Sequence, residues 1–287
     1  MLGKLIKHEW KETYKVNCML LAVLAVTTLL GFIALRSVVA MGETDMLERE
    51  PGFSAVWLII CVFTLGVYAL AMCSVSIGCY VYLCIHFYKS MYGAEGYLTH
   101  TLPVNKHKLL CSKIFVGGIW VMLLIIAMYT SVVALVSFSI PDFGLASMIK
   151  EISKGIAEVS AELKTNYGVN LAHYGVIFLV TMIISPFTSM MIVFGSISLG
   201  QLFPKVRVLM AFVIYFGLVI VMGIVRSVFS GMLNTYSLVS ASGTGIETLI
   251  RSTFGNQMYV MLAEQLVLAA LLYFASWWVC SRKLNLE

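Results

Sequence analysis

Six stretches of this sequence are apolar over lengths that match the interior of a lipid bilayer. A helix that crosses the hydrocarbon layer needs about 20 consecutive apolar residues, and each of the six stretches reaches that length. The composition agrees, because 60% of the 287 residues are hydrophobic and only 11% are charged, whereas roughly a quarter of the residues in soluble domains are charged. The predicted spans are residues 16–35, 53–87, 114–140, 174–199, 208–229 and 258–280.

These runs predict helices and not the strands of a barrel. Barrel strands alternate apolar and polar residues, whereas the apolar residues here follow one another without interruption. Backbone groups in hydrocarbon must also find their hydrogen-bond partners within the membrane, which a helix achieves by itself. We therefore expect an all-α integral membrane protein in which residues 16–287 form one domain of six transmembrane helices.

The positive charges predict the orientation of the chain. With an even number of spans both termini lie on the same side of the membrane, and cytosolic segments retain the excess of Lys and Arg. Placing the termini in the cytosol puts twelve of the 19 Lys and Arg residues inside and most acidic residues outside. The net charge of +5 is then explained by anchoring to anionic lipid, without a nucleic-acid partner.

Residues 1–15 are too charged to span a membrane and lack the pattern of a cleaved signal peptide. Their apolar residues recur at helical spacing, so we expect an elbow helix that lies in the membrane interface; a disordered basic leader is the alternative. The apolar positions are Leu2, Leu5, Ile6 and Trp10, and the lysines that would face headgroups are Lys4, Lys7, Lys11 and Lys15.

Two segments predicted to lie outside the cell differ in character. Residues 143–165 place apolar side chains on one helical face and charged ones around the rest, which predicts an amphipathic helix. This helix is expected to cap the bundle, contact the outer leaflet or meet a partner, and the sequence leaves these three open. Residues 230–257 carry four glycines among Ser, Thr and Asn, which predicts a mobile or re-entrant loop.

Motifs for catalysis are missing from the sequence. It contains no Gly-x-x-x-x-Gly-Lys-Ser/Thr phosphate loop, no His-Glu-x-x-His metal motif and no Gly-x-Ser-x-Gly elbow. Its seven cysteines form no Cys-x-x-Cys pair, and they are expected to behave as small buried apolar residues. We therefore expect a protein that is not an enzyme and that holds no metal or cofactor of its own.

One acidic residue, Glu264, falls inside a predicted span. A carboxylate there costs several kcal/mol unless it pairs, takes up a proton or reaches water. Arg226 comes late in the fifth span and should reach a similar depth from the opposite chain direction. We predict that the two form an intramembrane pair in the outer half of the bundle; the alternative is that each extends separately toward the outer headgroups.

A polar segment interrupts the apolar runs within residues 88–113. It reads Glu-Gly-Tyr-Leu-x-x-Thr-Leu-Pro-Val from Glu95 and is followed by lysines. Together with the leader, the six spans and the basic tail 282–287, this segment resembles the ABC-2-type permeases of bacterial ATP-binding cassette transporters. The resemblance implies a cytosolic coupling helix that docks on a separate ATPase. The docking residues would be Glu95, Gly96, Tyr97, Leu98, Leu102 and Pro103.

The resemblance also implies a location and partners. The protein would lie in the bacterial cytoplasmic membrane, pair with a second permease chain, identical or related, and work with two ATPase subunits that bind ATP and Mg. It would export or extract an amphipathic substrate such as a peptide, a drug or a lipid-like molecule. Two other classes stay open, namely a secondary transporter and a non-transporting sensor or scaffold, and residues 88–113 would then be an ordinary polar turn anchored by lysines.

Overall fold

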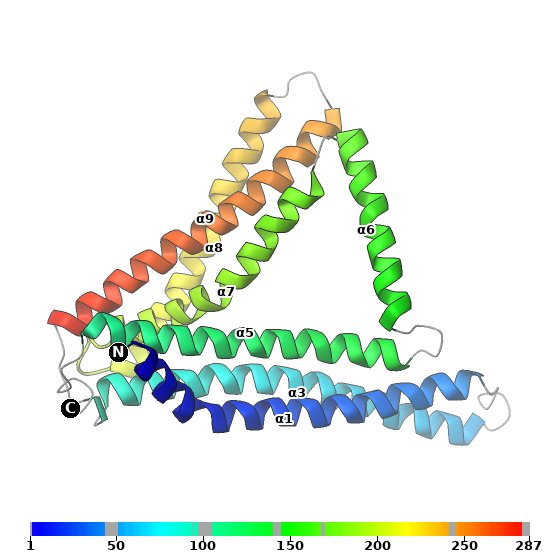
Figure 1. Ribbon diagram of the computed structural model, residues 1–287, viewed down its shortest axis with the longest axis horizontal. Helices are drawn as coiled ribbons and strands as arrows, with labels where there is room; N and C mark the ends of the chain where they lie inside the picture. Colours follow the sequence, from blue (N-terminus) through cyan, green and yellow to red (C-terminus); the bar gives the residue numbers. More distant parts are fainter. Residues whose placement is uncertain are drawn as a thin grey trace. The chain divides into compact units, whose positions relative to one another are not determined.

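The computed structural model describes residues 2–43, 51–93, 95–96, 105–139, 145–167, 170–240 and 245–282. Seven long helices account for nearly all of these residues (Figure 1). The helices are α1 (Leu2–Glu43), α3 (Pro51–Tyr92), α5 (Lys106–Ser139), α6 (Leu145–Tyr167), α7 (Leu171–Gly200), α8 (Arg207–Ser240) and α9 (Gly245–Arg282).

Six of these helices, all except α6, are long and apolar enough to cross a membrane. This confirms the predicted all-helical class and the six membrane-compatible helices. Several helices are longer than a bilayer requires: α3 has 42 residues and extends about 63 Å at 1.5 Å per residue, roughly twice the hydrocarbon thickness.

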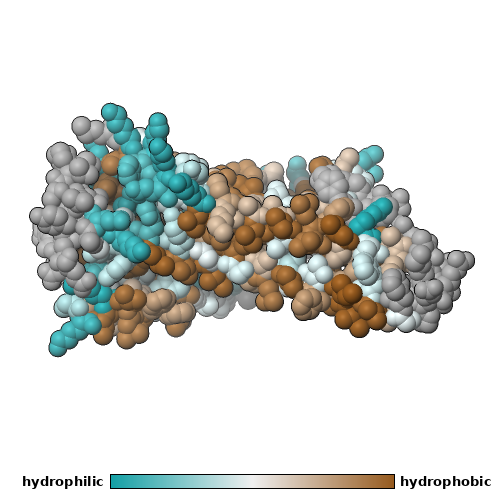
Figure 2. Space-filling model, turned by 90° about the horizontal axis from the view of Figure 1, so that it is seen from below, coloured by the Kyte–Doolittle hydropathy of each residue, from teal (hydrophilic) through white to brown (hydrophobic). Residues whose placement is uncertain are grey.

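Large apolar side chains cover the outside of these helices. Examples are Phe63 and Leu70 on α3, each 72% exposed, and Leu209 and Met232 on α8, 62% and 67% exposed. The face in Figure 2 shows apolar residues over the middle of the helices, with hydrophilic residues gathered mainly toward one end. Soluble proteins rarely expose continuous apolar surface of this extent, so a multi-pass membrane protein is the class that fits.

The chain divides into two compact units. The first comprises Met1–Trp10, Cys84–Ile119 and Ile156–Glu287, and the second comprises Lys11–Leu83 and Trp120–Gly155. In the first unit α7, α8 and α9 pack against one another (Figure 1). Their buried centre contains Met191, Leu268 and Leu272, and Gly195 lets α7 approach Leu272 so closely that an added Cβ would lie 3.1 Å from that side chain.

The second unit joins α1, α3 and the later part of α5 through polar side chains. The hydroxyl of Ser131 lies 2.7 Å from that of Thr28 on α1 and 2.7 Å from that of Tyr68 on α3. In an apolar environment such bonds are retained because an unpaired hydroxyl is costly to bury. They therefore fix which faces of the three helices meet.

The structure corrects the expectation of a loop over residues 230–257. α8 continues to Ser240 and α9 begins at Gly245, so the described part of this segment is helical. Small polar residues are accommodated there by hydrogen bonds: Thr235 Oγ1 donates to the Gly231 carbonyl at 2.8 Å, and Ser230 Oγ donates to Gln257 Oε1 at 2.7 Å. The first bond is within α8, whereas the second joins α8 to α9 and offsets the weak helix propensity of Gly and Ser.

The predicted leader and the first predicted span belong to one continuous helix, α1. No helix boundary separates residues 1–15 from the rest, as a distinct elbow would require. The interfacial position of these residues stays a prediction. The predicted amphipathic segment 143–165 corresponds closely to α6, Leu145–Tyr167.

Candidate functional site

The candidate site lies in the first unit, where α3 ends and α5 begins on either side of the polar segment. Gly93 N donates to the Tyr88 carbonyl at 3.1 Å and closes the end of α3. A side chain at Gly93 would bring a Cβ within 2.9 Å of the Lys89 carbonyl oxygen, so the chain leaves α3 in a form that suits glycine. Asn105 caps α5, because its Oδ1 accepts from His107 N at 3.2 Å.

Two of the predicted docking residues are described. Glu95 is exposed, and Gly96 is buried with its N–H donating to the Gly93 carbonyl at 2.8 Å. Tyr97, Leu98, Leu102 and Pro103 lie outside the described residues. A coupling helix in this segment therefore stays a prediction.

A buried charged cluster connects the start of α1 to both helices that flank the polar segment. Lys113 Nζ on α5 donates to Glu9 Oε1 and, at 2.8 Å, to the hydroxyl of Ser90 on α3. His86 Nε2, also on α3, lies 3.1 Å from the second oxygen of Glu9. The side chains of Lys113 and Glu9 are 3% and 9% exposed. We call Glu9, His86, Ser90 and Lys113 the Glu9 cluster.

Burial makes this cluster sensitive to the loss of any one member. Taking a carboxylate and an ammonium out of water costs several kcal/mol per ion, and their attraction recovers that cost only when the remaining polar atoms are also bonded. Lys113 meets this condition through Ser90, and Glu9 meets it through His86. The cluster therefore contributes little net stability, and its main effect is to determine how the three helix segments meet.

A second set of bonds ties the end of α3 to α7 and α9. The Tyr92 hydroxyl donates to Ser198 Oγ at 2.9 Å and lies 3.2 Å from Cys280 Sγ. Lys106 Nζ, at the start of α5, donates to the Cys280 carbonyl at 2.9 Å. This carbonyl belongs to the last turn of α9, where helix carbonyls have no partner within the helix and a cation is favourable. We call Tyr92, Lys106, Ser198 and Cys280 the Tyr92 cluster.

Aromatic contacts reinforce both attachments. The rings of Phe87 on α3 and Phe194 on α7 are stacked with their centroids 4.1 Å apart. At the start of α5, His107 stacks on Trp277 of α9 with a centroid separation of 4.6 Å, and its Nδ1 lies 3.0 Å from the Tyr273 hydroxyl. Both ends of the polar segment are thus held by side chains from α7 or α9.

Two adjacent glycines let α5 approach α7 closely. A Cβ on Gly117 would lie 3.2 Å from Met190 Sδ and 3.3 Å from the ring of Phe194. A Cβ on Gly118 would overlap the ring of Phe187. Any larger residue at position 118 must displace that ring, so close contact between the two helices depends on this glycine.

The structure also brings together the two charged residues predicted within the spans. Arg226 Nε on α8 donates to Glu264 Oε2 on α9 at 2.6 Å. The side chain of Glu264 is 7% exposed and that of Arg226 is 44% exposed. Among the described residues Arg226 is the charge partner of this carboxylate, whereas much of the guanidinium is uncovered.

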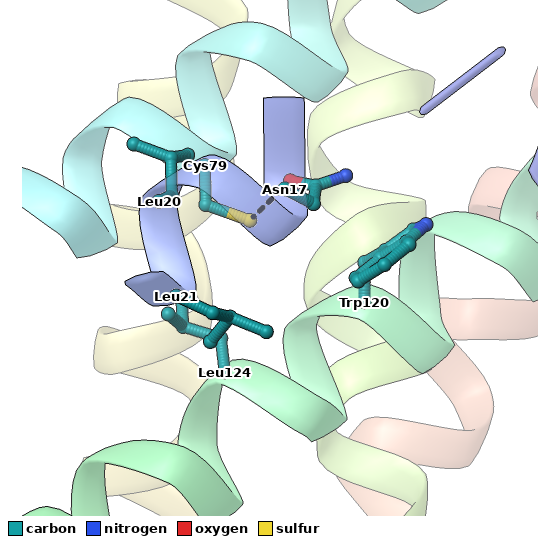
Figure 3. Close-up of a pocket in the computed structure, with 6 residues that line it drawn as sticks. All are labelled: Asn17, Leu20, Leu21, Cys79, Trp120 and Leu124. Carbon is teal, nitrogen blue, oxygen red and sulfur yellow. Dashed lines mark hydrogen bonds between the residues drawn. The ribbon is translucent and has the colours of Figure 1, made fainter. Parts of the chain in front are cut away.

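A small pocket in the second unit lies between α1, α3 and α5 (Figure 3). Cys79 Sγ donates to Asn17 Oδ1 at 3.4 Å at its edge. Its accessible volume of about 10 Å³ is near the minimum for one water molecule. This pocket is too small for an amphipathic substrate. Its lining residues are Asn17, Leu20, Leu21, Cys79, Trp120 and Leu124.

No family model, curated protein or solved structure matches this chain. The interpretation of the site therefore depends on its geometry. Among the described residues, the site offers buried hydrogen-bonded charges and close helix contacts that join the ends of α3 and α5 to α1, α7 and α9.

Sequence reasoning did not identify the Glu9 cluster. The sequence pattern places Lys113 among the lysines that follow the polar segment and does not single out Glu9. A signal was present, because Glu9 follows Leu5 by four residues and Ile6 by three and so lies on the apolar face of the leader. An acid on that face requires a buried partner, but the sequence does not say which lysine supplies it.

Proposed function

We propose that this chain is the membrane-spanning permease subunit of an ATP-binding cassette transporter. In this proposal residues 88–113 face the cytosol of a bacterium and receive a separate ATPase that binds ATP and Mg. Two ATPase subunits and two permease chains, identical or related, would form the working assembly. The cargo would be an amphipathic peptide, drug or lipid-like molecule, which is exported or extracted from the membrane.

The observation that carries the proposal is the attachment of both ends of the polar segment. The α3 end is bonded to α1 through the Glu9 cluster and to α7 through the Tyr92 cluster, and the α5 end is bonded to α9 by Lys106. A displacement applied to residues 93–105 would thus be passed to the packed helices α7, α8 and α9. A partner can drive transport only through a contact that differs between its own two states.

The docking step is tested with a bacterial cassette ATPase that co-purifies with this chain; the absence of any such ATPase would itself refute the proposal. Glu95 is exposed at the start of the segment, so Glu95→Arg should abolish co-purification with that ATPase and the stimulation of its ATP hydrolysis. Glu158→Arg on α6 is the matched control, because it reverses an exposed charge that the proposed topology puts on the other side of the membrane, and it should leave both unchanged. Equal association and stimulation for both variants would refute the docking role.

Transport itself is tested in vesicles that contain both subunits. Movement of a fluorescent lipid or a cationic amphipathic dye should require ATP and Mg. It should also be lost in Glu95→Arg, even though that variant folds.

One observation favours a secondary transporter as the second candidate. The Arg226–Glu264 pair places a nearly buried carboxylate between two spans, and intramembrane acids commonly carry coupling protons. A proton gradient would then drive transport without ATP, and Glu264→Gln would abolish it. The same vesicles distinguish the two candidates when an imposed pH gradient replaces ATP: a secondary transporter should still move the substrate, and a cassette permease should not.

A further inference from the structure

The apolar face of α6 is uncovered. Ile149, Ile152, Ile156 and Val159 are 63%, 49%, 55% and 48% exposed. At 3.6 residues per turn these positions fall on one side of the helix, and the complete apolar stripe is about 100° wide, as in helices that bury one face. Met148 and Leu163 also lie on this side and are half-buried, and Met148 Sδ accepts a hydrogen bond from Ser137 Oγ of α5 at 3.3 Å.

The lengths of the connections restrict where this helix can lie. α5 ends at Ser139 and α7 begins at Leu171, and both helices are long and apolar enough to cross a membrane. When both cross it, the two ends of α6 are joined to the same side of the membrane. Residues 140–144 and 168–170 separate α6 from its neighbours. Even fully extended, these connections reach only roughly 20 Å and 14 Å.

A helix standing upright on the membrane needs more length than these connections allow. The 23 residues of α6 extend about 34 Å, so an upright helix would carry one end farther from the membrane than either connection reaches. An upright helix would thus require α5 or α7 to project from the membrane, whereas a helix that lies along the surface requires no such projection. In the second orientation an apolar face turned toward the membrane contacts lipid along its whole length.

The charges on α6 indicate which interaction holds it there. Three lysines and three glutamates give the helix no net charge. Lys150 and Lys154 project from the side opposite the apolar stripe, Lys164 lies on one flank, and the glutamates lie on the other flank. Attraction to anionic headgroups is therefore weak, and insertion of the apolar stripe is the remaining source of affinity. The lysines are Lys150, Lys154 and Lys164, and the glutamates are Glu151, Glu158 and Glu162.

We propose that α6 binds the surface of the bilayer leaflet opposite the two chain termini. Ile149, Ile152, Ile156 and Val159 insert between the lipids at the level of the upper acyl chains. This inference requires that the six candidate spans cross the membrane, and it holds whether or not the protein is a cassette permease. The helix then anchors the connection between the third and fourth spans to the lipid.

The test uses the full chain in nanodiscs and places one small fluorescent amino acid on α6 by stop-codon suppression, which leaves the seven native cysteines intact. Positions 152 and 156 report the apolar face, and positions 154 and 158 are matched controls on the polar side. All four side chains are exposed, so the substitutions leave the core undisturbed. We expect dibrominated acyl chains to quench positions 152 and 156 at least twofold more than the controls, and aqueous iodide to show the reverse order.

Each other outcome overturns the proposal in a distinguishable way. Equal iodide quenching at all four positions would place the helix in water. Protection of 152 and 156 from both quenchers would mean that protein covers the face, from this chain or a partner. Acyl-chain quenching that appears only with anionic lipid would contradict insertion driven by the apolar stripe. A double variant, Ile152→Asn with Ile156→Asn, should also release a probe at Val159 into iodide, whereas Lys154→Asn with Glu158→Asn should not.

Discussion

Replacement of Lys113 by Met should be among the most destabilising single changes in this chain. The ammonium is 3% exposed and makes two bonds, to Glu9 and to Ser90. Its removal leaves the Glu9 carboxylate buried with His86 as its remaining partner within the cluster. Breaking a buried ion pair from one side costs about 3–5 kcal/mol, so we expect a loss of that size in the free energy of unfolding.

A double variant separates the attraction between the two charges of Glu9 and Lys113 from the cost of burying those charges. Replacing Glu9 by Leu and Lys113 by Met together removes both charges, and such replacements are often neutral or stabilising; Glu9→Leu alone completes the set of variants. The double variant should therefore be more stable than Lys113→Met by about 2 kcal/mol or more, which corresponds to strong coupling between the two sites. Lys108→Met is the control, because this lysine on the same helix is exposed and its loss should change stability by less than about 0.5 kcal/mol.

The measurement is unfolding in mixed micelles, followed by circular dichroism as the fraction of denaturing detergent rises. Coincident midpoints for Lys113→Met and Lys108→Met would show that the Glu9 cluster does not hold a buried charge. A loss of unfolding free energy in the double variant equal to the sum of the losses in the two single variants would show that Glu9 and Lys113 act independently. Either result would refute the proposed connection of α1 to α5 through this pair.

The remaining predictions concern the other contacts of the first unit, and each is measured by the same unfolding assay. Arg226→Gln should lower the free energy of unfolding by about 2 kcal/mol, because it leaves the nearly buried Glu264 carboxylate unpaired. Glu264→Gln should lower it by less than about 1 kcal/mol, because the half-exposed arginine can extend toward the headgroups. The opposite order of the two losses would contradict the observed burial. Gly118→Ala should destabilise by about 1–3 kcal/mol through overpacking against α7. Gly217→Ala, where an added Cβ meets nothing within 4 Å, should stabilise by up to about 1 kcal/mol through helix propensity, and equal effects at both glycines would contradict the close approach of α5 to α7.

Much of the site was outside the reach of sequence reasoning for a physical reason. Arg226 and Glu264 could be paired from the sequence because two antiparallel neighbouring spans fix their relative depth. Glu9 and Lys113 could not, because they are 104 positions apart in the chain and several lysines occupy similar depths. The hydroxyl of Tyr92, which meets Ser198 and Cys280, gave no signal because aromatic residues are common near membrane interfaces.

The expectation of a loop over residues 230–257 shows that local composition can also point to the wrong secondary structure. Glycine and serine lower helix propensity, but the hydrogen bond from Ser230 to Gln257 and the packing of α8 on α9 extend both helices through much of this segment. Local composition therefore predicted a loop where contacts between α8 and α9 stabilise helix.

The sequence by itself determined that this chain is helical and suited to a membrane, because apolar runs of bilayer length can satisfy their backbone only as helices. It also determined the amphipathic character of α6, since helical periodicity is a local property. Only the tertiary structure decided which charges pair and how the ends of the polar segment are attached to α1, α7 and α9. Those choices depend on distances between residues far apart in the chain, and composition and periodicity contain no information about such distances.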